Sequence, residues 1–144
     1  ALGLKRRGKP QQVYVVTGDG ELHEGANWEA FMFAAHQKLD NLTVIVDNNH
    51  HCMLGETEIV LTHGDLANKF AAFGWAVVEA QMGNTTAGIC AALDAAKADT
   101  SGKPKVIIAH TRKGNGVPGL EGAELCHVMA IKPAQIDQLL AEGA

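Results

Sequence analysis

Two short apolar runs in this 144-residue chain are each followed at once by small or polar residues, and this pattern constrains the fold more than any other feature. The first run, Val13–Val16, leads into Thr17-Gly18-Asp19-Gly20, and the second, Leu42–Val46, leads into Asp47-Asn48-Asn49. Both runs are rich in β-branched residues, which predicts two buried strands. Between them, apolar residues at helical spacing predict a helix over about residues 26–39, with apolar side chains on more than one side.

The rest of the chain continues this alternation of strands and helices. Two more apolar runs, 75–79 and 105–109, predict strands; helices are expected over 65–73, after Thr85 or Thr86, and over 133–140. The segment 50–63 has little periodicity and is expected to be a loop with an extended piece at 58–61. Such alternation predicts an α/β fold: a parallel sheet with helices on both faces, in a Rossmann-like layer architecture. Ligands of such sheets bind at the carboxyl ends of the strands.

The turn Gly18-Asp19-Gly20 follows the first strand and places one carboxylate between two residues without Cβ. A backbone of this kind allows close approach of a ligand. Asn49 follows the second strand and offers a neutral oxygen at the same edge of the sheet. A carboxylate, an amide oxygen, a backbone carbonyl, water and phosphate oxygens together satisfy the octahedral geometry of Mg²⁺. The two turns therefore predict an anchor for a metal ion and a diphosphate.

Gly18-Asp19-Gly20, followed after a spacer by Asn48-Asn49, resembles the thiamine-diphosphate signature, and residues 21–30, 38–42 and 73–75 resemble its version in the transketolase family. The likeness covers nearly the whole chain. Members of that family have a diphosphate-binding domain, a pyrimidine-binding domain and a C-terminal domain. Residues 1–144 resemble the middle and end of the first, so we expect a single, partial diphosphate-binding domain. The chain opens in mid-helix without a methionine, so we expect a fragment or a truncated gene product.

The resemblance implies the cofactors thiamine diphosphate and Mg²⁺. Asp19, Asn49 and the backbone carbonyl of His51 would then bind the metal ion. Gly18 and Gly20 would offer backbone groups to the diphosphate, with Glu21 beside them.

The resemblance also implies roles for more distant residues. Glu24 and Glu29 match acidic residues at a subunit contact, where Glu24 would take part in coupling two active sites. His127 matches a histidine that contacts the diphosphate and acts in catalysis, although the glycine usual after it is replaced by Val128. Residues 110–116 resemble a Lys-Gly-Lys-Gly loop, with Asn115 in place of the second lysine.

The resemblance implies that the enzyme is a transferase, which moves two-carbon ketol units between sugar phosphates. The glutamate that activates the cofactor lies on the pyrimidine-binding domain in this family, so the chain alone is expected to be inactive. A pyrimidine-binding domain or subunit is the expected partner, in a homo- or hetero-oligomer. Two alternatives remain open: a Rossmann-type dinucleotide-binding module, since Asp47 ends the second strand as in NAD-binding units, and a non-catalytic truncated fragment.

The composition limits the kinds of partner and the cellular compartment that are expected for this chain. The net charge of −4 argues against a nucleic-acid surface, and no apolar run reaches the ~20 residues of a membrane span. Three cysteines without Cys-x-x-Cys spacing, and no signal peptide at the start, favour the cytoplasm. His50, His51, Cys52 and His63 do not suggest zinc, because adjacent side chains rarely converge on one ion and no second cysteine pair is present.

Overall fold

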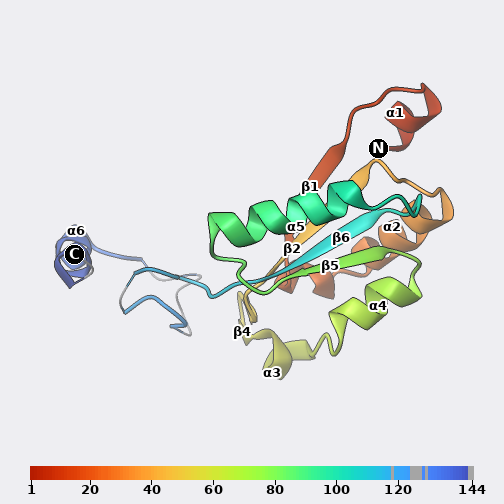
Figure 1. The fold of residues 1–144 in the computed structure, drawn as a ribbon. Coiled ribbons are helices and arrows are strands. Elements are labelled where there is room, and N and C mark those ends of the chain that lie inside the picture. Colours follow the sequence, from red (N-terminus) through yellow and green to blue (C-terminus); the bar gives the residue numbers. More distant parts are fainter. Residues whose placement is uncertain (118, 124–127, 129, 143–144) are drawn as a thin grey trace.

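Four parallel strands form the sheet at the centre of the protein (Figure 1). The computed structural model describes residues 1–117, 119–123, 128 and 130–142. In spatial order the strands are β1 (Val13–Gly18), β2 (Leu42–Asn48), β6 (Lys105–His110) and β5 (Ala76–Ala80). This arrangement confirms the α/β class. The register aligns Gly18 with Asp47 and Asn48 with His110, so the carboxyl ends meet at one edge.

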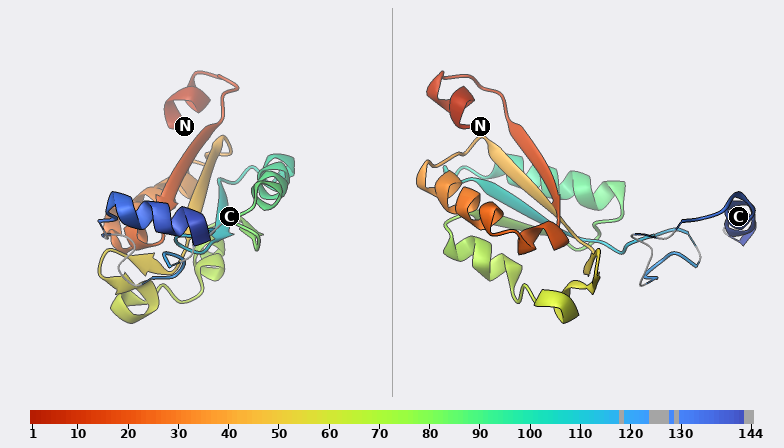
Figure 2. Two further views of the ribbon diagram at one scale, coloured as in Figure 1. Left: turned by 90° about the vertical axis from the view of Figure 1, so that its left-hand side faces the viewer. Right: turned by 180° about the vertical axis from the view of Figure 1, so that it is seen from behind.

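Helices cover both faces of the sheet, as expected (Figure 2). Helix α5 (Thr86–Ala98) packs on one face, and α2 (Gly25–His36) and α4 (Leu66–Ala72) pack on the other. Successive side chains of β6 point to opposite faces of the sheet. Val106 and Ile108 join the core under α2 and α4, and Ile107 and Ala109 join the core under α5. Strand β6 is therefore buried on both sides, as a central parallel strand should be.

Strand β1 lies at the edge of the sheet, and here the expectation of a buried strand is wrong. Tyr14, Val15 and Val16 are 45%, 44% and 70% exposed. Their composition is that of a buried strand, but no strand pairs with the outer edge of β1 among the residues that the structure describes. In α2, Met32 and Phe33 are also about half exposed while Phe31 and Ala34 are buried, so that helix is covered on one side only.

The segment after β2 is more structured than the sequence predicted. It contains a small hairpin of β3 (His51–Cys52) and β4 (Gly55–Glu56), followed by helix α3 (Thr57–Leu61). The extended piece expected at 58–61 is therefore wrong. Thr57 is buried and its N–H donates to the carbonyl of His50, where the chain leaves the sheet. In the described part of the chain no strand pairs with the β-branched Ile59 and Val60, which lie in α3.

Three short elements complete the fold: the 3₁₀ helix η1 (Gly20–His23), α1 (Leu2–Arg6) and α6 (Pro133–Glu142), which lies apart from the sheet (Figure 1). Two predicted caps are present. Asp65 accepts a hydrogen bond from the N–H of Asn68 at the start of α4, and Thr85 accepts one from Gly88 at the start of α5. No helix in the described parts of the chain has the length and apolar character required to cross a membrane.

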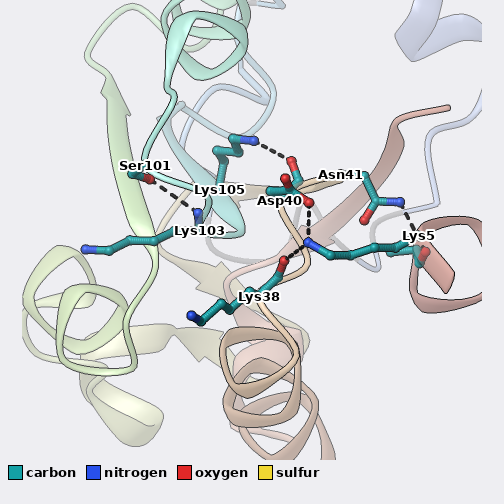
Figure 3. A network of polar contacts seen from close by, with 8 residues as sticks. Lys5, Lys38, Asp40, Asn41, Ser101, Lys103 and Lys105 are labelled. Atoms are coloured by element: carbon teal, nitrogen blue, oxygen red, sulfur yellow. Dashed lines mark hydrogen bonds and ion pairs between the residues drawn. The ribbon is translucent and has the colours of Figure 1, made fainter. Parts of the chain in front are cut away.

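A polar network holds the opposite, amino-terminal edge of the sheet together (Figure 3). The Lys5 ammonium contacts the Asp40 carboxylate at 2.6 Å and the carbonyl of Lys38, and Lys105 donates to the carbonyl of Asp40. Asn41 donates to the carbonyl of Ala1 at 3.1 Å. These contacts join α1, the turn before β2 and the start of β6, away from the candidate site.

Candidate functional site

An open cavity of about 590 Å³ lies where β1 and β2 end. The Gly-Asp-Gly turn, the end of β2, the hairpin, α3 and the segment after β6 all contribute to its wall. The lining residues are Gly18, Asp19, Gly20, Glu21, His23, Glu24, Asp47, Asn49, His51, Cys52, Met53, Leu54, Val60 and Lys113. The structure thus brings together every residue that the sequence predicted for the metal ion and the diphosphate, apart from His127.

Asp19 is fully buried at the head of η1. Its carboxylate accepts hydrogen bonds from the N–H groups of Gly20 at 2.8 Å and His50 at 2.7 Å, and Thr57 donates to it at 3.4 Å. Burial raises the pKa of Asp19 above its usual value, although the two N–H groups act against this. A buried carboxylate whose hydrogen-bond donors are neutral N–H and O–H groups favours binding of a cation.

The N–H groups of the Gly-Asp-Gly turn are all used within the protein. Gly18 donates to the Glu21 carboxylate at 3.0 Å, Asp19 donates to the carbonyl of Asp47 at 3.1 Å, and Gly20 donates to Asp19 itself. Glu21 also accepts a hydrogen bond from Thr17. The expected backbone donors to a diphosphate are therefore engaged elsewhere in this structure, and the Glu21 carboxylate, which lines the cavity, is hydrogen-bonded to the turn.

Asn49 is the second expected metal ligand, and its amide is held at both ends. Its Oδ1 accepts from the N–H of His51 at 2.9 Å, and its Nδ2 donates to the Asp47 carboxylate at 2.9 Å. The His51 imidazole lies 3.1 Å from the carbonyl of Asn49. His50 takes a positive φ of 62°, and this turn directs the chain from β2 into the hairpin.

Charge in the cavity is mainly negative. In the part of the chain that the structure describes, Asp19, Glu21, Glu24 and Asp47 line it, and the ammonium group that lines it belongs to Lys113. A diphosphate would be repelled by such a wall unless a divalent cation bound with it. The available ligands are a carboxylate, an amide oxygen and backbone carbonyls, the hard oxygen donors that Mg²⁺ prefers. Among the described residues no group of three or more His, Cys, Asp or Glu side chains is placed to hold a metal ion by itself.

The outer rim of the cavity is apolar, a feature that the sequence did not predict. Met53 and Leu54 at the tip of the hairpin are 66% and 78% exposed, and Ile59 and Leu61 on α3 are 79% and 60% exposed. Val60 between them lines the cavity. We call this surface, residues 53–54 and 59–61, the apolar rim. Exposed apolar surface next to a polar cavity marks a site for a partner or a ligand.

The remaining candidates are placed less centrally. Glu24 is exposed at the N-cap of α2 and lines the cavity, whereas Glu29 is exposed one turn further along the helix. His127 lies outside the described residues. In the segment 110–116, Lys113 lines the cavity, and Thr111 and Arg112 fix the segment to Asp47 and Asn84.

The protein is therefore a parallel α/β domain, with an acidic cavity at the carboxyl ends of two adjacent strands. Within that class its family is shown by comparison with known proteins. The family model described as "Transketolase, thiamine diphosphate binding domain" matches residues 8–142. The chain belongs to this family.

Curated relatives of the chain are also named as transketolases or their subunits. The chain is 40% identical over 142 residues to one subunit of the apulose-4-phosphate transketolase of Actinobacillus succinogenes, covering 99% of the chain and 50% of that protein. It is 36% identical over 148 residues to SqwG, a 6-deoxy-6-sulfo-D-fructose transketolase subunit of a Clostridium species, covering 53% of that protein. The chain thus spans about half the length of these relatives.

Solved structures agree with this assignment. Transketolase from Leishmania mexicana matches with a TM-score of 0.84 and 35% identity, over 99% of this chain and 22% of that one. Transketolase from Campylobacter jejuni matches with a TM-score of 0.82 and 30% identity, over 94% of this chain and 21% of that one.

Proposed function

We propose that this chain binds thiamine diphosphate together with Mg²⁺ and forms the diphosphate-binding part of a transketolase-type enzyme. The single observation that carries the proposal is the buried Asp19 carboxylate beside Asn49 in a cavity with four acidic residues and one lysine. Such a cavity suits a diphosphate only if a cation accompanies it. A dinucleotide-binding module is less well supported, because a pyrophosphate without a metal ion would meet these carboxylates directly.

In this proposal each group of the cavity has one task. Asp19, Asn49 and the carbonyl of His51 hold Mg²⁺, and the metal ion joins them to the diphosphate. Gly18, Gly20 and Glu21 shape the turn that carries Asp19. Lys113 adds positive charge near the phosphates, and His127 would contact them. Thiamine diphosphate supplies the carbanion chemistry when bound, so the protein's part is to hold and orient it.

The substrates and the partner belong to the same proposal. We infer transfer of two-carbon ketol units between sugar phosphates, in the cytoplasm and in an oligomer with a pyrimidine-binding domain or subunit. Both curated relatives described above are named as transketolase subunits, which supports a partner chain. The apolar rim, with Glu24 beside it in the cavity wall and the exposed Glu29 further along α2, is the surface we assign to that contact, since a covered rim would also close the cavity.

Titration calorimetry tests the cofactor proposal. Thiamine diphosphate should bind in the presence of Mg²⁺ and fail to bind with EDTA. Asp19→Ala should remove this binding; it should also cost about 1–3 kcal/mol of stability, because three donors lose their acceptor. Unfolding curves identify conditions in which the variant is folded. Asp94→Ala, an exposed acid on α5, serves as the control. Equal affinity with EDTA, or in folded Asp19→Ala, contradicts the proposal.

A further inference from the structure

Asp47 connects three parts of the cavity wall that are distant in the sequence. Its backbone carbonyl accepts the N–H of Asp19 at 3.1 Å. One carboxylate oxygen, Oδ2, accepts from the amide of Asn49 at 2.9 Å, and the other, Oδ1, accepts from the hydroxyl of Thr111. Thr111 is 64 residues away, directly after β6. Asp47 thus contacts the residues of both predicted metal-binding turns and the segment that carries Lys113.

The contacts of Asn49 define the orientation of its amide. A carboxylate can only accept a hydrogen bond, so the group that faces Asp47 must be the NH₂. A backbone N–H can only donate, so the group that faces His51 must be the oxygen. Reversing the amide would place a donor against a donor and an acceptor against an acceptor. The two neighbours therefore fix Oδ1, the atom that the proposed metal ion needs, on the side of the hairpin.

We propose that Asp47 is a positioning residue, which holds the Asn49 amide in the orientation that presents its oxygen to Mg²⁺, and that Thr111 holds Asp47. This inference rests on the proposed cofactor function and deepens it, because it assigns roles to two residues that were not among the predicted ligands. Groups that orient metal ligands typically change metal affinity 10- to 100-fold when removed.

Thr111 holds the second oxygen of the Asp47 carboxylate. Its N–H donates to the carbonyl of Asn48 at 3.2 Å, which fixes the start of the segment after β6 against the end of β2. Its hydroxyl has one proton and directs it to Asp47. The carboxylate is then held on both oxygens and cannot rotate away from Asn49 without losing one hydrogen bond. Removing the hydroxyl frees that rotation.

Affinity for Mg²⁺ at saturating thiamine diphosphate tests the proposal. Asp47→Ala should weaken Mg²⁺ binding about 10-fold, at the lower end of the usual range because His51 still favours the same orientation. Asp47→Asn should stay within about threefold of the wild type, since its oxygen can accept from Asn49 while its NH₂ donates to a reversed Thr111 hydroxyl. Thr111→Val should weaken binding by less than Asp47→Ala, and Thr111→Ser should restore it. Asp94→Ala is the matched control.

A double-mutant cycle separates positioning from direct binding of the metal ion by Asp47. If Asp47 acts through Asn49, adding Asp47→Ala to Asn49→Ala should cause no further loss of Mg²⁺ affinity. Independent, multiplicative losses, or an Asp47→Asn variant as weak as Asp47→Ala, would make Asp47 a ligand in its own right and overturn the proposal.

A measurement without cofactor keeps this inference distinct from the proposed function. In the metal-free protein, NMR should show the Asn49 side-chain amide protons protected from exchange with water, and this protection should be lost in Asp47→Ala and reduced in Thr111→Val. Circular dichroism and unfolding curves establish that each variant is folded. Unchanged protection in Asp47→Ala overturns the positioning role, whatever the result for cofactor binding. Absence of Mg²⁺-dependent binding in the wild type, with protection as expected, contradicts only the proposed function.

Discussion

The indole nitrogen of Trp28 donates a hydrogen bond to the carbonyl of Leu22 at 2.8 Å, and this contact ties helix α2 to the 3₁₀ turn that carries Asp19. The indole ring packs against Phe31, Phe70 and Phe73, with ring centroids 5.5–5.7 Å apart. A partly buried residue that packs against the core therefore supports the position of a candidate metal ligand. Trp75 makes an equivalent contact, 3.0 Å to the carbonyl of Phe31, away from the cavity.

Trp28→Phe should weaken cofactor binding as well as stability. The change keeps most of the aromatic packing but leaves the carbonyl of Leu22 unpaired, at a cost of about 1–3 kcal/mol. Trp75→Phe is the matched control: it should lose similar stability without affecting Mg²⁺-dependent binding of thiamine diphosphate. Urea unfolding and calorimetry on both variants provide the measurement. Equal effects on binding would mean that the Trp28 contact is structural only.

Gly20→Ala tests the close approach of the turn to the hairpin. A Cβ at residue 20 would lie 2.8 Å from the Cβ and 3.2 Å from the Cα of Cys52. The hairpin that carries His51 must then shift, and we expect a loss of about 1–3 kcal/mol in stability, as for other overpacked sites, together with weaker Mg²⁺-dependent binding. Cys52→Gly should restore part of both. Gly25→Ala, where an added Cβ meets nothing within 4 Å, is the control.

The Lys5–Asp40 contact should make the free energy of unfolding depend on pH in the acid range. The hydrogen bond from Lys5 holds the pKa of Asp40 below its usual value. The folded state therefore binds this proton less tightly than the unfolded state, so the stabilisation is present at neutral pH and is lost as the pH falls below about 4, through the folded-state pKa. Because both groups are partly exposed, the effect is at most about 1 kcal/mol.

Comparison of Lys5→Met with the wild type measures this contribution. The difference in unfolding free energy should be largest near pH 7 and should shrink as the pH is lowered to 3. Lys97→Met removes a longer, more exposed pair with Asp94 at 3.7 Å and should give a smaller difference. A Lys5→Met difference that grows towards low pH would contradict the assignment.

How far the sequence predicts this protein depends on whether a feature is local. The Gly-Asp-Gly turn, Asp19, Asn49 and the caps Asp65 and Thr85 follow from residue types next to strand ends and helix starts, and all lie where the sequence placed them. Whether a strand lies at the edge of the sheet does not depend on its own residues alone. Val13–Val16 has the composition of a central strand, and only the strand order shows that its outer side is exposed.

The parts of the site that the sequence did not predict depend on contacts across the chain. Thr111 reaches Asp47 over 64 residues, and no spacing in the sequence indicates that pairing. The sequence suggested a role for Asp47 only as a dinucleotide-type acid, although its place at the end of β2, two residues before Asn49, was a usable signal. The apolar rim was not predicted because Ile59 and Val60 suggested a strand, whereas they belong to a short exposed helix.

Exposed apolar surface predicts self-association of the isolated chain. Tyr14, Val15 and Val16 on β1 present a hydrophobic edge that no strand of the described residues pairs with, and Phe33 on α2 adds exposed apolar surface; such surface favours association with another chain. Sedimentation velocity should show species larger than a monomer. Val16→Lys should reduce them, because a charge on the edge opposes pairing, whereas Ile136→Lys on α6 should not. A monodisperse monomer at high concentration would contradict this prediction.

Catalysis should require a second chain or domain. The cavity supplies oxygen ligands for a metal ion, and its apolar rim is open; the glutamate that activates the cofactor is expected on a pyrimidine-binding partner. Transfer from xylulose 5-phosphate to ribose 5-phosphate should therefore be undetectable with the purified chain, even at saturating thiamine diphosphate and Mg²⁺. Adding a pyrimidine-binding partner should produce turnover.

In that reconstituted system Glu24→Ala should reduce turnover more than it reduces cofactor binding by the free chain. Glu24 lines the cavity but its side chain makes no capping hydrogen bond to α2, so its removal has little reason to disturb the fold. Glu24→Gln distinguishes a need for charge from a need for a hydrogen bond at the contact. Robust turnover by the chain alone would show that the cavity contains a complete active site and that the proposed division of labour is wrong.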